Sequence, residues 1–289
     1  MWIRRLLPHL VIWPPLALSV FYIVSFTLWT TWLSFTDSEL VTSDTWVGFK
    51  NYTSIISQTK VQTAYLNLVI YGLCFVVLAS LIGLLLAVLV DQRIRAENLF
   101  RSIFLYPMAL SFIVTGTVWS WILNPGLGIQ KLVQNLGWAG FKFNWIVDRD
   151  MAIYTIVIVA AWQASGFAMA LFLAGLRSVD GDIVKAAEID GASKMRTYFS
   201  VVFPCMMPMF ITVFVLLLQF AIKTYDLVWV MTGGGPGTST ALPTLVVYDY
   251  MFERGQLGRG SAAAVLMLST LLLVLVPYWI WRRRRQVAI

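Results

Sequence analysis

Long runs of apolar residues dominate the chain, and short polar stretches separate them. A helix needs about 20 predominantly apolar residues to cross the hydrocarbon core of a bilayer. The runs therefore predict an all-α, polytopic membrane protein with six transmembrane helices, over residues 11–35, 66–90, 103–123, 151–176, 201–231 and 261–281. We find no repeat with a period of 20–50 residues and no Ser- or Pro-rich linker, so we expect one transmembrane domain over residues 1–289.

Composition supports a lipid environment. Only 12% of the 289 residues are charged and 59% are hydrophobic, whereas soluble domains carry about 25% charged residues. The formal net charge of +7 can indicate nucleic-acid binding. Here the basic residues stand at the ends of the apolar runs and in a cluster at 282–285, which is typical of membrane topology. We therefore expect lipid and no nucleic acid as a partner.

The placement of lysine and arginine predicts the orientation. If the N-terminus is cytoplasmic, the connections 91–101 and 178–200 are cytoplasmic too, and together with both termini they hold most of the basic residues. This asymmetry favours a multi-pass protein with both termini in the cytoplasm. The connections 36–65 and 124–150 then face outward. The second of them, NPGLGIQKLVQNLGW at 124–138, is either a helix on the outer membrane surface or on a partner, or an ordinary re-entrant turn.

The polar stretch at about 180–200 has the local signals of a helix–turn–helix. Asp180 and Asp182 are N-cap candidates, and the residues IVKAAEI that follow are good helix formers. Gly191 then ends the first helix because glycine readily adopts left-handed backbone angles. Ser193 can cap a second short helix that runs through Phe199. The turn is rich in small side chains, which suit a knob inserted into a second protein, although an amphipathic interfacial connector explains them too.

Several motifs carry a resemblance to a known family. The octapeptide KAAEIDGA at 185–192, with Pro204 downstream, resembles the EAA loop of binding-protein-dependent ABC importer permeases. Other stretches resemble the carbohydrate-uptake branch of that family, of the maltose or glycerol-phosphate permease type: GFKNY (48–52), LFRSIFLYP (99–107), WQASGFAMALFLAGL (162–176), YDLVWVMTGGGPGTST (225–240) and GRGSAAAVL (258–266).

The resemblance implies a function and a set of partners. In that family the EAA loop docks in a cleft of a separate ATP-hydrolysing subunit, so the expected coupling residues are Lys185, Ala186, Ala187, Glu188, Asp190, Gly191, Ala192 and Ser193. The chain would form half of an alternating-access pathway for a sugar, in the bacterial inner membrane. Its partners would be a second, non-identical permease, two ATPase subunits and an extracytoplasmic sugar-binding protein. ATP and Mg²⁺ would belong to the ATPases, and this chain would bind no cofactor.

One coupling position departs from the family pattern. Lys185 stands where the family has its leading Glu, which reverses the charge. Glu188, nearly one helical turn further on, can substitute for the missing carboxylate, or the ATPase of this system presents an acidic group instead.

The chain carries no motif for chemistry of its own. A P-loop needs Lys and Ser or Thr after its glycines, but neither residue type follows in this order after GGGPG at 233–237, so we interpret that segment as a tight turn. With one histidine in the chain, several catalytic sets are excluded. We therefore expect no enzyme. The alternatives are a stand-alone secondary transporter, although we see no paired inverted repeats, and a membrane-embedded enzyme.

Polar residues inside the apolar runs are candidates for a substrate path. Lys223 and Asp226 lie three residues apart and, on a continuous helix, would share a face with Gln219. They can line a pathway, or they can form a structural ion pair or anchor, because Lys223 lies about 33 Å beyond Val201 at the helical rise and hence near the interface. Trp162 and Gln163 can stack on and bond a sugar, although the small residues around them also favour close helix packing. The further candidates are Tyr225, Asn67 and Tyr71.

Overall fold

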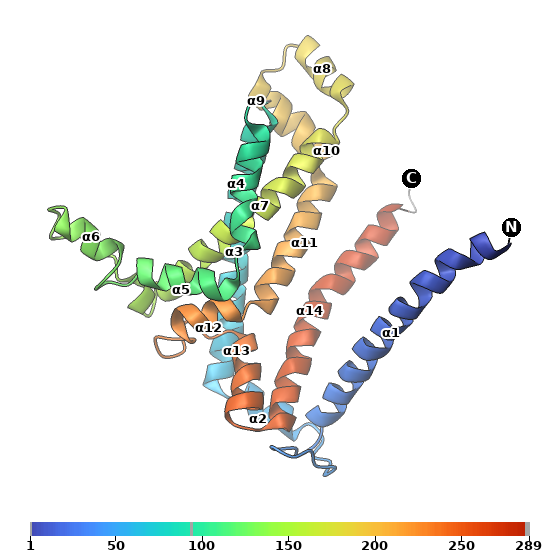
Figure 1. Ribbon diagram of the computed structural model, residues 1–289, viewed down its shortest axis with the longest axis vertical. Helices are drawn as coiled ribbons and strands as arrows, with labels where there is room; N and C mark the ends of the chain where they lie inside the picture. The colour runs from blue at the N-terminus through green and yellow to red at the C-terminus, as the bar shows by residue number, and fades with distance from the viewer. Residues whose placement is uncertain (1, 93–94, 287–289) are drawn as a thin grey trace. The chain divides into compact units, whose positions relative to one another are not determined.

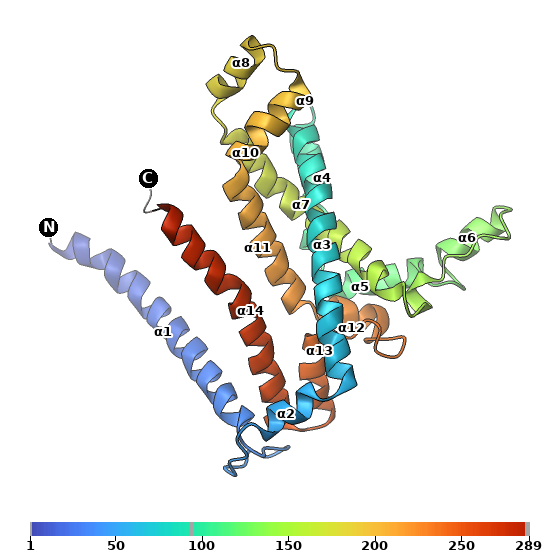
Figure 2. The same cartoon turned by 180° about the vertical axis from the view of Figure 1, so that it is seen from behind.

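The computed structural model describes residues 2–92 and 95–286. Over these residues the regular elements are helices, apart from an isolated β-bridge between Thr36 and Trp46. The predicted all-α class is confirmed. The chain forms two compact units, residues 1–62 together with 246–289, and residues 63–245. Figures 1 and 2 show the helices of both units from opposite sides.

The candidate membrane spans are of two kinds. Four continuous helices are long and apolar enough to cross a bilayer: Ile12–Ser34, Thr59–Asp91, Ala152–Arg177 and Leu257–Ile280. Two further candidates are bent pairs, Glu97–Ala109 with Phe112–Ile122 at 94° and Lys194–Cys205 with Met207–Lys223 at 69°. The described residues thus provide four spans, or up to six if each bent pair is one span.

The continuous helices predicted over 103–123 and 201–231 are wrong. The first is broken at Leu110, whose ψ of 144° is extended, and the second bends near Met206 and stops at Lys223, before Thr224 with its ψ of 118°. A break frees backbone groups that lipid cannot hydrogen-bond. Side chains from elsewhere bond them: Gln163 donates to the carbonyl of Leu110 at 3.0 Å, and Thr244 donates to the carbonyl of Thr224 at 2.5 Å.

The first unit is built on α1 (Trp2–Ser34) and α14 (Leu257–Gln286), which pack against each other. Near one end of the pair, α2 (Lys50–Ile56) supplies Asn51, whose amide donates to the carbonyls of Ser34 and Thr36 at 3.0 and 2.9 Å. Gly258 lies so close that a Cβ there would be 2.3 Å from the Thr36 oxygen. The motifs GFKNY and GRGSAAAVL therefore meet at this junction and hold it together.

A buried carboxylate, that of Asp249, joins two more segments of the same unit. Asp249 begins η3 (Asp249–Glu253), a π-helical turn that follows α13 (Pro243–Tyr248). Its carboxylate binds Lys60, in the first turn of α3 (Thr59–Asp91), at 2.6 Å and Arg254 at 2.9 Å. Burial raises the pKa of Asp249, but the hydrogen bonds from Arg254 and Lys60 outweigh it and hold the pKa below its ordinary value of 3.8.

This carboxylate should make the first unit acid-sensitive. Because the folded-state pKa is depressed, the stabilisation is fully present above the ordinary value of 3.8 and is lost as the pH falls through the lower folded-state pKa. Lys60→Met should destabilise the chain by about 1.5–3 kcal/mol at neutral pH, since it removes a hydrogen bond to a charged group. Thermal unfolding in detergent measures the loss. Lys50→Met, at an exposed position on α2, is the matched control, and an equal loss in both variants would contradict the assignment.

The second unit is organised around α7 (Ala152–Arg177), most of whose residues are buried. Helices α4 (Glu97–Ala109) and α11 (Met207–Lys223) pack on α7, and α5 (Phe112–Ile122) packs on α12 (Asp226–Thr232). A Cβ on Gly166 would lie 1.8 Å from the backbone oxygen of Phe104, so α4 and α7 touch at this glycine. The shorter elements are α6 (Ile129–Asn135), η1 (Trp145–Val147), α8 (Gly181–Ile189), α9 (Lys194–Thr197), η2 (Tyr198–Val202) and α10 (Phe203–Cys205).

Candidate functional site

The hairpin of α8 and α9, residues 180–197, has the caps that the sequence predicts. The Asp180 side chain accepts from the amide of Asp182 at 2.9 Å, and the Ser193 hydroxyl accepts from the amide of Arg196 at 3.4 Å. Helix α8 ends in a Schellman motif: the amide of Ala192 donates to the carbonyl of Ala187 and that of Gly191 to Glu188, both at 3.0 Å. Gly191 has a φ of +79°, a conformation that favours glycine.

The hairpin presents uncovered apolar surface. None of the residues of α8 is buried. Ile189 is 85% exposed, and Met195, which follows the turn, is 71% exposed. Exposed apolar side chains beside small ones leave room for another protein to approach the hairpin. A Cβ on Gly191 would meet nothing within 4 Å in this chain, so the space in front of the turn is open.

Lys185, where the sequence reverses the charge of the motif that it resembles, forms only an exposed ion pair. The Lys185 ammonium lies 2.9 Å from an oxygen of Asp182, one turn back on α8, but both side chains are largely exposed, at 72% and 84%. An exposed pair of this kind contributes little to stability. Lys185 is therefore available to an acidic group on another protein. Glu188 is exposed on the same helix.

A three-residue ion cluster lies at the base of the hairpin, and sequence reasoning missed it. Arg177, at the end of α7, binds Glu97 of α4 at 2.7 Å and approaches Asp91 at the end of α3 at 3.5 Å. Arg177 was not singled out from the sequence. Its partners lie 80 or more positions away, so no local signal pointed to them. The cluster ties the ends of three helices together next to the hairpin.

A cavity of about 160 Å³ lies within the second unit, between α3, α7, α11 and both helix breaks. Aromatic and aliphatic side chains make up most of its wall, as in many small-molecule sites. Five of the predicted pathway residues line it: Tyr71, Gln163, Lys223, Tyr225 and Asp226. The other lining residues are Phe75, Met108, Phe112, Ala160, Ala164, Phe220, Thr224 and Leu227.

Gln163 is the buried polar group of this cavity. Its side chain is 1% exposed, and its Nε2 donates to the Leu110 carbonyl at the first helix break. Its Oε1 is buried without a hydrogen-bond partner among the described residues. An orphaned acceptor in such a place is costly, and a hydroxyl group of a bound solute would satisfy it. The structure thus gives Gln163 both a structural bond and a free acceptor.

The second helix break places the remaining polar groups. The Tyr71 hydroxyl lies 3.2 Å from the Thr224 hydroxyl, at the point where α11 has ended. Lys223 and Asp226 stand on either side of the break and are exposed. The shared helix face and the ion pair considered for Lys223 and Asp226 both assumed a continuous helix, which ends at Lys223. Lys223–Asp226 is absent from the ion pairs of the described residues.

Three predicted pathway residues lie outside the cavity lining. Trp162 packs edge-on against Trp119 with ring centroids 5.5 Å apart. Gln219 is half-buried on α11. Asn67 donates to the carbonyls of Thr238 and Ala241 at 3.1 and 3.0 Å, so it fixes the glycine-rich loop after α12.

That glycine-rich loop is the tight turn expected from the sequence. Gly233 ends α12 with a φ of +59°, and Gly234 and Gly237 also have positive φ values. The Thr240 hydroxyl bonds back to the carbonyl of Gly235 at 2.8 Å and contacts the Thr232 hydroxyl at 2.7 Å. With the two bonds from Asn67, the loop is closed on itself and attached to α3.

Comparison with known proteins identifies the family to which this chain is similar. Residues 79–283 match the family of the binding-protein-dependent transport system inner membrane component. A probable ABC transporter permease protein of Pyrococcus horikoshii is 37% identical over 279 residues, which cover 95% of this chain and 96% of the relative. The trehalose/maltose transport system permease protein of Thermococcus litoralis is 28% identical over 273 residues, 94% and 92% of the two chains.

A solved structure shares the fold. A chain of a bacterial ABC transporter involved in the import of the polysaccharide alginate superposes with a TM-score of 0.83 at 15% identity, over 97% of this chain and 96% of that one. The fold and the sequence relatives define a class, the multi-pass permease subunits of ABC transporters, which are not catalytic themselves. The chain belongs to the family of inner membrane components of binding-protein-dependent transport systems.

Proposed function

We propose that this chain is one of two non-identical permease subunits of a bacterial inner-membrane importer that takes up a sugar from an extracytoplasmic binding protein. The sugar would be a monosaccharide, a disaccharide or a glycoside. The trehalose/maltose permease relative supports this substrate class. The cavity supports it too, because aromatic faces around a buried amide acceptor suit the apolar faces and hydroxyl groups of a sugar.

The observation that carries the proposal is the uncovered hairpin. Its Schellman turn presents Gly191, Ala192 and Ser193, and its apolar side chains have no cover in this chain. A separate ATPase subunit docks there and holds ATP and Mg²⁺, so this chain needs no cofactor. Lys185, Ala186, Ala187, Glu188 and Asp190 make up the rest of the contact. The Arg177 cluster then passes the motion of the hairpin to α3, α4 and α7.

The second permease completes the pathway. The exposed cavity residues Lys223 and Asp226 face that subunit, and the cavity opens alternately to the two sides of the membrane. The hairpin and both termini lie in the cytoplasm, and the glycine-rich loop faces outward toward the binding protein.

Crosslinking in the intact assembly tests the proposal. Cys74 and Cys205 are the free cysteines, so a cysteine-free variant with Ala192→Cys or Ser193→Cys carries the single reactive site. We expect crosslinks to a co-purifying ATPase that has a P-loop. We also expect that sugars from a panel compete with the transported sugar for uptake. Labelling by lipid or water reagents alone, or uptake by this chain without an ATPase, would refute the proposal and favour a stand-alone secondary transporter.

Gln163 provides a test of the pathway itself. Gln163→Ala removes the unpaired acceptor, and the loss of one hydrogen bond to the sugar should weaken transport affinity about tenfold or change the order of preference among sugars. Gln219→Ala is the matched control, because Gln219 lies outside the cavity lining. Uptake kinetics with several sugars measure both variants. The same affinity and preference in Gln163→Ala as in the unmodified chain would place the path elsewhere.

A further inference from the structure

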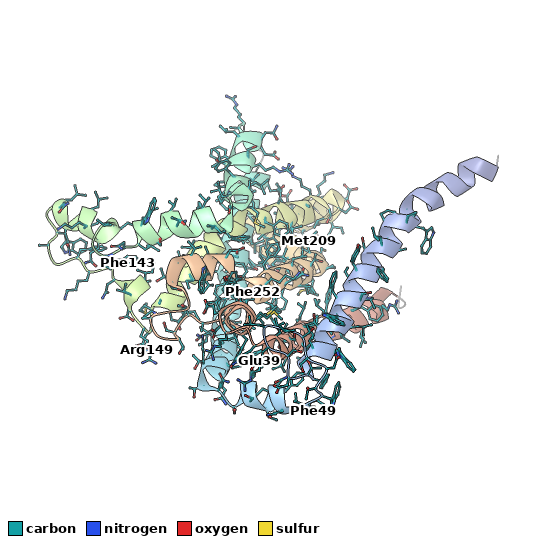
Figure 3. All side chains as sticks on the ribbon, turned by 60° about the horizontal axis from the view of Figure 1, so that its bottom comes forward. Glu39, Phe49, Phe143, Arg149, Met209 and Phe252 are labelled. Atoms are coloured by element: carbon teal, nitrogen blue, oxygen red, sulfur yellow. The ribbon has the colours of Figure 1, made fainter. Side chains whose placement is uncertain are left out.

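Residues 123–147, most of the segment between α5 and α7, form an arm that stands apart from the helices of its own unit (Figures 1 and 2). Two glutamines on one face attach its single α-helix, α6, to the segment that returns toward α7. The Gln130 side chain accepts from the amide of Phe143 at 2.7 Å, and Gln134 donates to the carbonyl of Phe141 at 2.9 Å. Figure 3 labels Phe143 and Arg149 on the stretch that leads back to α7.

The opposite face of α6 is apolar and uncovered. At about 100° per residue, Leu132 and Leu136 lie about 200° from the two glutamines. Leu132 is 60% exposed and Leu136 is 80% exposed. Leu127, just before α6, and Trp138, just after it, are also apolar and are 81% and 65% exposed.

The exposed apolar face of α6 needs apolar material to pack against. Helix α6 has seven residues and none of them is buried. Isolated helices this short are unstable in water, and helices in proteins owe most of their stability to the packing of an apolar face. The two glutamine bonds hold only the polar side of α6. The apolar side is therefore stabilised by something outside this chain.

The position of the arm favours lipid as that cover. Helix α5 belongs to a candidate span, and its last residues Trp121 and Ile122 are apolar and exposed, as on a lipid-facing surface. The chain folds back at once after α5, because a Cβ on Gly128 would lie 1.9 Å from the Ile122 oxygen. Helix α6 thus begins close to the last residues of α5, the second half of a candidate span that bends by 94°.

Charge and aromatic residues point to the same cover. Residues 123–147 carry Lys131 and Lys142 and no carboxylate, and Asp148, Arg149 and Asp150 follow in the turn that leads into α7. Cations flanking an apolar face are typical of helices that lie in the headgroup region of anionic membranes. Trp138 and Trp145 belong to the residue type that concentrates at this depth.

We propose that the α6 arm is a membrane foot: it lies in the plane of the bilayer interface, inserts Leu132, Leu136 and Trp138 among the acyl chains, and holds Lys131 and Lys142 against anionic headgroups. The foot fixes the N-terminal end of α7, the end opposite to the hairpin. Movement of the hairpin then tilts α7 against a fixed end, and the arm does not move freely with it.

Depth-dependent fluorescence quenching tests this proposal on the full chain. The cysteine-free variant with Leu132→Cys is labelled with an environment-sensitive dye and reconstituted in phosphatidylglycerol vesicles whose acyl chains carry bromine. We expect blue-shifted emission and strong quenching. Lys131→Cys, its neighbour on a different face, is the matched control and should be quenched several-fold less. Lys131→Gln with Lys142→Gln should reduce the quenching at position 132 more in phosphatidylglycerol than in zwitterionic phosphatidylcholine.

Three results would overturn the proposal. Water-like emission and no quenching at position 132 would place α6 in solvent. Shielding at position 132 that arises only when a binding protein is added would make the arm a protein docking site. Equal strong quenching at 131 and 132 would place the whole helix in a re-entrant path. None of these outcomes depends on the sugar or on coupling to an ATPase.

Discussion

Gly191→Val is expected to abolish uptake while the chain still inserts and accumulates in the membrane. Valine is strained at the φ of +79° that Gly191 adopts, so the Schellman turn at the end of α8 opens. The surface formed by Ala192 and Ser193 is then lost. Uptake of the transported sugar, membrane abundance and ATPase co-purification together measure the effect. Loss of both uptake and the co-purifying ATPase is the expected pattern.

Two control variants separate the causes. Gly191→Asn keeps the turn, because asparagine tolerates positive φ, but it adds a side chain to a surface that is open in this chain. Loss of uptake in this variant therefore indicates close approach of a partner. Gly181→Ala, at another exposed hairpin glycine whose Cβ would meet nothing within 4 Å, should leave uptake unchanged. Normal uptake in Gly191→Val would contradict the docking role of the hairpin.

Gly166→Ala should destabilise the second unit and stop transport. The added Cβ would lie 1.8 Å from the Phe104 oxygen and 2.6 Å from its carbonyl carbon, so α4 has to move away from α7. Overpacking of this kind costs about 1–3 kcal/mol and occasionally more. The movement also displaces Leu110 from Gln163 and so distorts the cavity. Thermal unfolding in detergent and uptake measure the two consequences.

Gly72→Ala is the matched control for this variant. Gly72 also lies inside a helix of the second unit, but its Cβ would meet its nearest neighbours at 3.8 Å, an ordinary contact. Alanine in a helix interior is better than glycine by about 0.5–1 kcal/mol, so this variant should be neutral or slightly more stable. A stability of Gly166→Ala equal to that of Gly72→Ala would show that the contact between α4 and α7 is not tight.

The hairpin could be predicted in detail because its signals are local. Asp180, Gly191 and Ser193 act on amides and dihedral angles within a few residues of themselves, so a single sequence specifies both caps and the turn. The direction in which Lys185 pairs was not predicted, because Asp182, one turn back, was taken only as a capping residue. A helix was one of the two alternatives predicted for residues 124–138, and α6 occupies the middle of that segment.

The broken spans could not be predicted, because the bonds that permit them come from distant residues. Leu110 lies in an apolar run like any other, and its carbonyl is bonded by Gln163, 53 positions later. Thr224 depends in the same way on Thr244 and Tyr71. Hydropathy reports that a segment suits lipid but not where it bends.

Some residues of the cavity could be predicted from the sequence and others could not. Gln163, Lys223 and Asp226 stood out because polar residues inside an apolar run are costly, and the structure brings them to one cavity. Phe75, Phe112 and Phe220 gave no signal, since an aromatic residue on an apolar helix has many possible neighbours. Asn67 was noticed for the right reason, its polarity, but its amide bonds the glycine-rich loop instead of lining the cavity.

The bonds of Asn67 and Tyr71 have a mechanical consequence. These two residues are one turn apart on α3 and bond opposite ends of residues 224–241. Tyr71 contacts Thr224 at the start, and Asn67 donates to Thr238 and Ala241 near the end. A rotation of α3 about its own axis therefore displaces both sets of hydrogen bonds together. The rim of the cavity and the loop beyond α12 should therefore move together when α3 rotates.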